Sequence, residues 1–419
     1  MASSLPHYET STLSNGLQVV AIPMDNGSQV ISTDIFYQVG SRNEVMGKSG
    51  IAHMLEHMNF KSTKNLKAGE FDEEVKSVGG LNNASTGFDY THYYIKSSTE
   101  NLPKSLSLFA ELMQNLNLKD DEFQPERNVV AEERRWRTDN NPMGYLYFRL
   151  FNSAYVYHPY HWTPIGFMND IQTWTLEDIR SFHKTYYQPK NAILVVTGDI
   201  TADRVFEEAQ KHFGNVPNTV DIPEKKIIEP EQDGERRVIV NKESEVEMLA
   251  ISFPIPNFQH ADQPKLSALS EMLSTGKSSR LNRVLVDEKR LVNQIYAYNM
   301  ENIDPGVFLF LAVCNNGIPA ESVEKEIWDV IKSLQNKPVE EAELNKIKIN
   351  TRADFIYSLE SSTSVADLFG SYLARGDISP LMRYESAIEA LKPDEIQAVA
   401  KHYLVPEKST TIILRKGQK

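Results

Sequence analysis

Hydrophobic and polar positions along the first half of the chain alternate between the spacing of strands and the spacing of helices. Apolar runs rich in Val, Ile, Phe and Tyr predict strands at residues 17–23 and 31–39, and a continuous apolar run predicts a buried strand at 191–198. Residues 49–60 have helical spacing, and helical patterns dominate from 102 to 183. The first half is therefore expected to mix helices and strands.

A second series of elements follows an irregular stretch rich in Pro, Asn, Asp and Glu at residues 215–235. Strand patterns at 237–241 and 248–253 precede a helical pattern at 263–275, and a strand pattern at 410–414 ends the series. We expect an N-terminal domain at 1–215, a linker at 216–235 and a C-terminal domain at 236–419.

The two series of elements have a faint internal repeat. Sliding the sequence by about 215 residues places Ile51–Met58 on residues 266–273. Glu271 then aligns with Glu56, whereas Ala268 and Met272 stand in place of two histidines. So faint a repeat can also be a coincidence, but the order of elements agrees with it. The sequence predicts an α+β fold with two homologous domains.

A cluster of two histidines and a glutamate, His53, Glu56 and His57, lies inside the first predicted helix. At about 100° per residue all three project from one face of the helix. The apolar side chains lie on the opposite face: Ile51, Met54, Leu55 and Met58. Two imidazoles one turn apart can bind one zinc ion, and the glutamate between them can act as general base on a water molecule. The alternative is a pair of solvated surface histidines.

A third zinc ligand is expected on a second helix, within the stretch from Glu126 to Glu133. Helical spacing of about 100° per residue places both of these glutamates on the apolar side, with Val129 and Val130, and places Glu132 toward its edge. We therefore prefer Glu133 as the ligand and expect Glu126 to orient a ligand imidazole from behind. Ordinary surface glutamates are the alternative interpretation.

Composition narrows the choice of ligands and partners. The single cysteine, Cys314, can form neither an internal disulfide nor a Cys-rich zinc site. The 57 acidic and 44 basic residues give a net charge of −13, which argues against a nucleic-acid partner. No apolar run approaches the ~18 residues of a membrane span. Because the first 16 residues do not resemble a signal peptide, we expect a cytoplasmic protein, or a periplasmic or organellar one if a targeting segment was removed.

The order H-x-x-E-H is the inverted zincin signature. Three stretches, GIAHMLEHMNFKST, GGLNNASTGFDYTHY and ERNVVAEE, together resemble the pitrilysin/insulysin family of zinc metallopeptidases. The likeness is to its short bacterial and mitochondrial-processing-peptidase-like branch, and it covers the first half well and the second half in layout. The 75 residues between His57 and Glu133 match the family spacing, and Glu126 matches its acidic residue seven positions before the ligand.

The resemblance implies two homologous halves arranged as a clam-shell, each with a mostly antiparallel sheet covered by helices. It implies one Zn²⁺ per chain and a zinc-dependent endopeptidase or processing peptidase that hydrolyses unfolded or short peptides. It also implies that substrate adds as a strand near Asn83, Ala84 and Thr86, which would be β-augmentation. The same residues also suit a simple turn and strand start.

A pair of substrate-contacting residues of the family is missing. Family members with a complete site carry an Arg and a Tyr after an S-S-R-L-like turn, which is present here at residues 278–281. The aligned positions hold Val286 and Asn293, and reaching Tyr296 or Tyr298 needs an insertion. In heterodimeric members one subunit holds zinc and the other supplies this pair. We therefore expect a zinc-bearing subunit that needs a homologous partner; a homodimer is also possible.

Two other classes of function remain. A catalytically silent homologue could act as an assembly or peptide-binding scaffold, although such proteins usually lose the metal ligands that are present here. A structural metal site would be closed by four protein ligands, and the sequence offers no evident fourth ligand.

Overall fold

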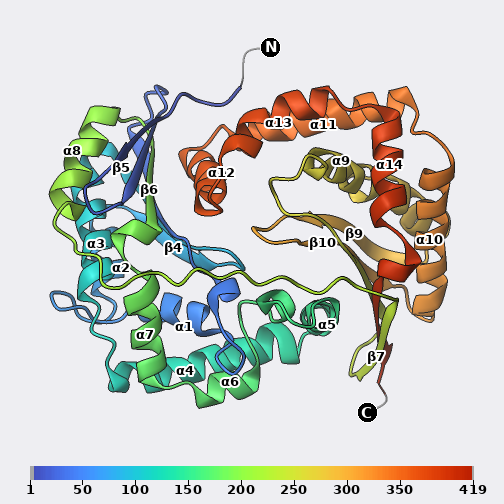
Figure 1. Ribbon diagram of the computed structural model, residues 1–419, viewed down its shortest axis with the longest axis horizontal. Helices are drawn as coiled ribbons and strands as arrows, with labels where there is room; N and C mark the ends of the chain where they lie inside the picture. Colours follow the sequence, from blue (N-terminus) through green and yellow to red (C-terminus); the bar gives the residue numbers. More distant parts are fainter. Residues whose placement is uncertain (1–3, 418–419) are drawn as a thin grey trace.

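The computed structural model describes residues 4–417 and shows two sheets side by side, one in each half of the chain (Figure 1). The first sheet has the order β1-β2-β6-β3-β5-β4 and consists of β1 (Glu9–Thr12), β2 (Gln18–Pro23), β3 (Val30–Tyr37), β4 (Leu81–Thr86), β5 (Thr91–Ser98) and β6 (Ala192–Gly198). The second has the order β7-β11-β8-β10-β9 and consists of β7 (Arg236–Lys242), β8 (Met248–Pro254), β9 (Val292–Met300), β10 (Val307–Cys314) and β11 (Thr410–Lys416).

The two sheets have the same topology. Without β1, each contains five strands in which the first along the chain pairs in parallel with the last, and every other pairing is antiparallel. Each sheet ends at the third strand of its series, β4 in the first and β9 in the second. The predicted α+β fold with two homologous, mostly antiparallel halves is therefore confirmed.

Helices surround both sheets. The first half contains α1 (Ile51–Met58), α2 (Glu70–Ser77), α3 (Leu102–Asn115), α4 (Asp120–Arg134), α5 (Pro142–Ala154), α6 (Met168–Thr173), α7 (Leu176–Tyr186) and α8 (Ala202–Phe213). The second half contains α9 (Gln263–Ser274), α10 (Ala320–Asn336), α11 (Glu341–Ser358), α12 (Ser362–Ala374), α13 (Ser379–Glu389) and α14 (Pro393–Tyr403). Two π-helical segments follow α4 and α9: η3 (Arg135–Asp139) and η6 (Asn282–Glu288).

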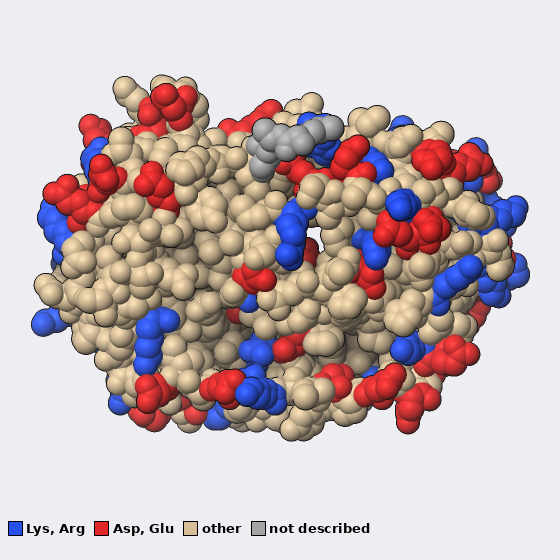
Figure 2. Space-filling model, turned by 45° about the horizontal axis from the view of Figure 1, so that its top comes forward, with Lys and Arg blue, Asp and Glu red and all other residues tan. Residues whose placement is uncertain are grey.

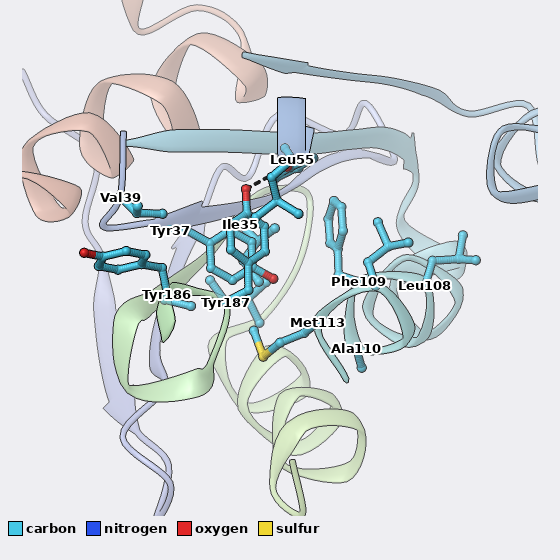
Figure 3. Packing of buried hydrophobic residues seen from close by; sticks show 14 of the residues in the cluster. Ile35, Tyr37, Val39, Leu55, Leu108, Phe109, Ala110, Met113, Tyr186 and Tyr187 are labelled. Carbon is cyan, nitrogen blue, oxygen red and sulfur yellow. Dashed lines mark hydrogen bonds between the residues drawn. The ribbon is translucent and has the colours of Figure 1, made fainter. Parts of the chain in front are cut away.

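The main core of the first half lies between its sheet and its own helices. Figure 3 shows Ile35 and Tyr37 of β3, Leu55 of α1 and Phe109 and Met113 of α3 in one packed cluster. All five side chains are buried. The helix with the predicted metal ligands has its apolar face in this core, and it packs on β4 of the sheet and on α4 and α7.

The opposite face of each sheet is covered by a helix from the other half. Helix α12 lies on β3 and β6 of the first sheet, where Phe369 joins a cluster with Phe36 and Val195. Helix α5 lies on β8 and β11 of the second sheet, where Phe151 joins a cluster with Ile412. The halves thus exchange one helix each, an arrangement that the sequence patterns did not predict.

The stretch between α8 and β7 has no regular structure and crosses from one half to the other as an extended chain (Figure 1). The predicted linker at 216–235 lies within it. The predicted domain boundaries stay a prediction, because α5 and α12 each pack on the half to which they do not belong in sequence.

Charged side chains are mixed over the visible surface. On the face that Figure 2 shows, the acidic and basic groups of the described residues are interspersed, and the basic ones form no broad patch. Among residues 4–417, no helix is both long and apolar enough to cross a membrane.

The exchange of α12 can be tested at Gly370. A Cβ at this position would lie 2.0 Å from the ring of Phe36. We expect Gly370→Ala to lower the free energy of unfolding by about 1–3 kcal/mol, the usual cost of overpacking a tight core, measured by urea denaturation. Gly234→Ala is the control, since its added Cβ would meet nothing within 4 Å. Equal stability of both variants would contradict the close packing of α12 on β3.

Candidate active site

The beginning of α1 is fixed by a glycine and a buried carboxylate. Gly50 precedes the helix with a φ of 84°, a left-handed conformation that suits glycine, and an added Cβ would lie 2.6 Å from the carbonyl oxygen of Ile165. The carboxylate of Glu44 accepts hydrogen bonds from the backbone N–H of Gly50 at 2.9 Å and of Ala52 at 2.8 Å. The indole N–H of Trp162 donates to the same group at 2.7 Å. Burial raises the pKa of Glu44 to about 8, against these three donors, which lower it.

The two faces of α1 are divided as the spacing predicts. The apolar residues of the predicted packing face are at most 3% exposed: Ile51, Met54, Leu55 and Met58. His53 is 9% exposed on the other side, beside the partly buried Glu56 and His57. The rings of His53 and His57 have centroids 4.7 Å apart and meet edge to face.

Glu133 of α4 completes a group of three ligands. Its Oε2 lies 3.7 Å from Nε2 of His53 and 3.3 Å from Nε2 of His57. One ligand atom of each of the three residues lies within 4.8 Å of the others, and among the described residues only this group of His, Cys, Asp and Glu could hold a metal ion. Two imidazole nitrogens and one carboxylate oxygen fit catalytic zinc, which keeps a fourth position open.

Glu126 lies behind His57. Its Oε1 is 2.8 Å from Nδ1 of His57, and its Oε2 is 2.5 Å from Nζ of Lys61. This contact leaves Nε2 of His57 directed toward Glu133, as the predicted orienting role requires. Nδ1 of His53, in contrast, is buried and has no hydrogen-bond partner among the described residues.

The prediction that Glu126 and Glu133 lie beside two buried valines is half wrong. Val130 is fully buried, but Val129 is 49% exposed. The glutamates lie at the boundary between the packed and the open side of α4, and helical angles alone could not tell how wide the packed side is. Glu132 is exposed and pairs with Arg135, which supports the preference for Glu133.

The pKa values of the ionisable groups in this cluster are shifted in different directions. Burial, reinforced by the charge of His57, lowers the pKa of His53 to about 4. Burial also opposes the charge of His57, but Glu126 and Glu133 outweigh it and raise the pKa of His57 to about 9. Burial raises the pKa values of these two glutamates, but their contacts with His57 and with nearby cations, Lys61 at Glu126 and Arg137 at Glu133, together lower them below the usual value. Without metal, a proton on His57 therefore takes the place of the metal's charge.

Glu56 is held by a residue of β4. The Thr86 hydroxyl donates a hydrogen bond to Oε2 of Glu56 at 2.5 Å. Burial raises the pKa of Glu56, and the hydrogen bond from Thr86 lowers it. A carboxylate with a raised pKa beside two histidines that could bind a metal ion has the properties of a general base.

The predicted substrate residues lie along β4, the strand at the end of the first sheet. Asn83 is exposed, Ala84 packs partly against the first core, and Thr86 contacts Glu56. In the second half, Val286 packs against the core and Asn293 is exposed on β9. Neither residue supplies the missing Arg or Tyr.

Sequence reasoning missed two cations of the site. Lys61 contacts Glu126, and Nε of Arg137 lies 3.0 Å from Oε1 of Glu133. Arg137 follows Glu133 by four residues, so the i,i+4 neighbour rule for helices could have found it. Lys61 lies beyond the end of α1 and pairs with a residue of α4, so no local spacing indicates its contact.

A two-half α+β fold with H-x-x-E-H on one helix and a glutamate on a second helix defines an inverzincin-type metallopeptidase scaffold. Residues 19–158 match the family model described as insulinase (peptidase family M16), and residues 173–351 match the model described as peptidase M16 inactive domain. The chain belongs to the M16, or pitrilysin, family, as its motifs predicted.

Three known proteins illustrate the relationship. The zinc protease PqqE of Helicobacter pylori is 56% identical over 416 residues, which are 99% of this chain and 94% of that protein. The crystal structure of a protease from Helicobacter pylori has a TM-score of 0.97 at 56% identity, covering 98% of this chain and 100% of that one. The mitochondrial-processing peptidase subunit beta of Lentinula edodes is 26% identical over 95% of this chain and 88% of its own length.

We expect zinc binding by the metal-free protein to release about one proton at pH 7. His57, with a pKa of about 9, must lose a proton to offer Nε2, whereas His53, with a pKa of about 4, is already neutral. Apparent affinity then rises roughly tenfold per pH unit up to about pH 9. Titration calorimetry in buffers of different ionisation enthalpy measures this release.

Glu126→Gln is the matched variant for the proton count. It removes a carboxylate that raises the pKa of His57, so we expect less proton release at pH 7 and zinc affinity weaker by about 10- to 100-fold. Unchanged proton release would show that Glu126 does not control this histidine.

Proposed function

We propose that this chain is a zinc-dependent endopeptidase or processing peptidase that hydrolyses peptide bonds in unfolded or short peptides. The observation that carries the proposal is the convergence of His53, His57 and Glu133, with Glu56 on the same helix between the two histidines. The name of the 56% identical zinc protease agrees with it. We propose one zinc ion per chain.

Each residue of the site has a distinct proposed role in the reaction. Zinc, when bound, lowers the pKa of its water toward ~7 and polarises the substrate carbonyl. His53, His57 and Glu133 would hold it, and Glu126 fixes the ring of His57 through Nδ1. Glu56 accepts a proton from the attacking water as the new C–O bond forms. It returns the proton to the amide nitrogen as the C–N bond breaks.

Substrate is proposed to bind along the free edge of β4. No strand of the described chain pairs with this edge, and Leu81 on it is 69% exposed. A peptide added there as a strand would satisfy the backbone groups of β4 and run past Thr86, whose hydroxyl reaches Glu56. Backbone pairing reads little sequence, which suits unfolded substrates.

A homologous partner is proposed to complete the site. The family uses an Arg and a Tyr in the second half. At the aligned positions this chain has Val286, which packs against the core, and Asn293. The name of the Lentinula edodes relative, a subunit beta, suits a protein that acts with a second subunit. The model described as an inactive domain matches residues 173–351, which include Val286 and Asn293, and keeps a silent scaffold as the alternative function.

Glu56→Gln tests the mechanism. We expect zinc content to stay at the wild-type level, because Glu56 is not a ligand, and peptide hydrolysis to fall about 100- to 10,000-fold with the loss of the general base. Metal analysis and hydrolysis of a fluorogenic peptide measure the two effects. The control is Glu132→Gln, since Glu132 is exposed and pairs with Arg135, away from the candidate metal ligands. Unchanged hydrolysis in Glu56→Gln would refute the mechanism.

Activity of the isolated chain tests the partner. We expect the purified, zinc-loaded chain to hydrolyse unstructured peptides weakly. We expect addition of a homologous chain that carries Arg and Tyr at the positions matching Val286 and Asn293 to raise kcat. Full activity of the chain alone would show that no partner is needed. Zinc binding without hydrolysis in either case would favour the scaffold.

A further inference from the structure

The two carboxylate oxygens of Glu133 face different partners. Oε2 lies 3.7 Å from Nε2 of His53 and 3.3 Å from Nε2 of His57. Oε1 lies 3.0 Å from Nε of Arg137. One oxygen is therefore directed at the metal position, while the other is engaged in an ion pair.

Arg137 lies where α4 passes through the π-helical segment η3 toward α5. Its side chain is 63% exposed, whereas that of Glu133 is 16% exposed, so the guanidinium lies on the solvent side of the carboxylate. Its charge also lowers the pKa of both Glu56 and His53, although burial is the larger influence on each. Single π-helical turns within helices often occur at functional sites.

The two carboxylate oxygens of Glu126 also face different partners. Its Oε1 contacts Nδ1 of His57 at 2.8 Å, and its Oε2 contacts Nζ of Lys61 at 2.5 Å. Each of these two glutamates thus has one oxygen at His57 and the other at a cation. In both cases the cation lies four residues after a ligand.

We infer that Arg137 is a positioning residue that keeps Glu133 a one-oxygen ligand of the metal. A carboxylate can bind a metal through one or both oxygens. A second oxygen on the metal would raise its coordination number and crowd the position that a catalytic zinc needs for water. By engaging Oε1, Arg137 leaves this position open. The inference rests on the proposed function only in taking the metal to be zinc.

The ion pair contributes to the site rather than to folding. Because the Arg137 side chain is largely exposed, its ion pair adds little to protein stability, so Arg137→Ala is expected to unfold at the wild-type urea concentration. In the variant, Oε1 is released and can turn to the metal. We expect kcat to fall about 10- to 100-fold, the usual effect of removing a partner of a ligand. KM is expected to stay unchanged, because Arg137 is assigned no substrate contact.

X-ray absorption of the zinc-loaded protein tests the inference without relying on hydrolysis. We expect wild type to have two imidazoles, one carboxylate oxygen and one water oxygen around zinc, and Arg137→Ala to gain a second carboxylate oxygen. Visible absorption of the Co²⁺-substituted forms is expected to weaken in the variant as the coordination number rises. Arg137→Lys keeps the charge and is expected to restore part of the wild-type spectrum and kcat.

The matched control is Arg135→Ala, since Arg135 lies in the same π-helical segment but pairs with the exposed Glu132. It is expected to retain the wild-type spectrum and kcat. A wild-type spectrum in Arg137→Ala would overturn the inference, and so would a loss confined to KM, which would assign Arg137 to substrate instead. A chain that binds zinc without hydrolysing peptides would refute only the proposed function, since the spectra still decide the role of Arg137. A chain that takes up no zinc would overturn both.

Discussion

The exchange of α5 and α12 between the two sheets is the constraint on which the rest of the structure depends. Each sheet has an apolar face that its own half leaves uncovered, and burying it requires a helix from the other half. Helix α4 leads through η3 directly into α5. Glu133 therefore lies just before the point where the chain leaves one half to pack on the other, while His53 and His57 stay on α1 in the first core. The relative position of the ligands follows from the packing of both halves.

Charge balance explains why so many ionisable groups can share this partly buried place. Three carboxylates and two imidazoles meet two cations there: Glu56, Glu126, Glu133, His53, His57, Lys61 and Arg137. Lys61 and Arg137 each offset one carboxylate, and a proton on His57 offsets the third negative charge when metal is absent. A bound zinc ion would replace this proton and add one further positive charge, so both the metal-free and the metal-bound site would be nearly balanced in charge.

The sequence correctly predicted which side chains face the site where the geometry of a single helix determines it. The angles of α1 separated His53, Glu56 and His57 from the packing face, and the same reasoning placed Glu133 ahead of Glu132. The sequence did not predict features that depend on contacts between segments far apart along the chain. An amphipathic pattern shows that α5 and α12 bury a face, but not on which sheet, and it could not show that Val129 remains open. The strands β9 and β10 were not predicted at all. They are the counterparts, in the second sheet, of β4 and β5 in the first.

The difference between the halves is itself a packing effect. Ala268 and Met272, which align with the two histidines, are at most 1% exposed and belong to the second core. Apolar side chains therefore occupy the face of α9 that would have to remain open around a metal. Glu271 remains at the position of Glu56, and burial raises its pKa, but it has no neighbouring imidazoles to give that property a use. The fold is repeated in both halves, but among the described residues only the first half brings together side chains that could hold a metal ion.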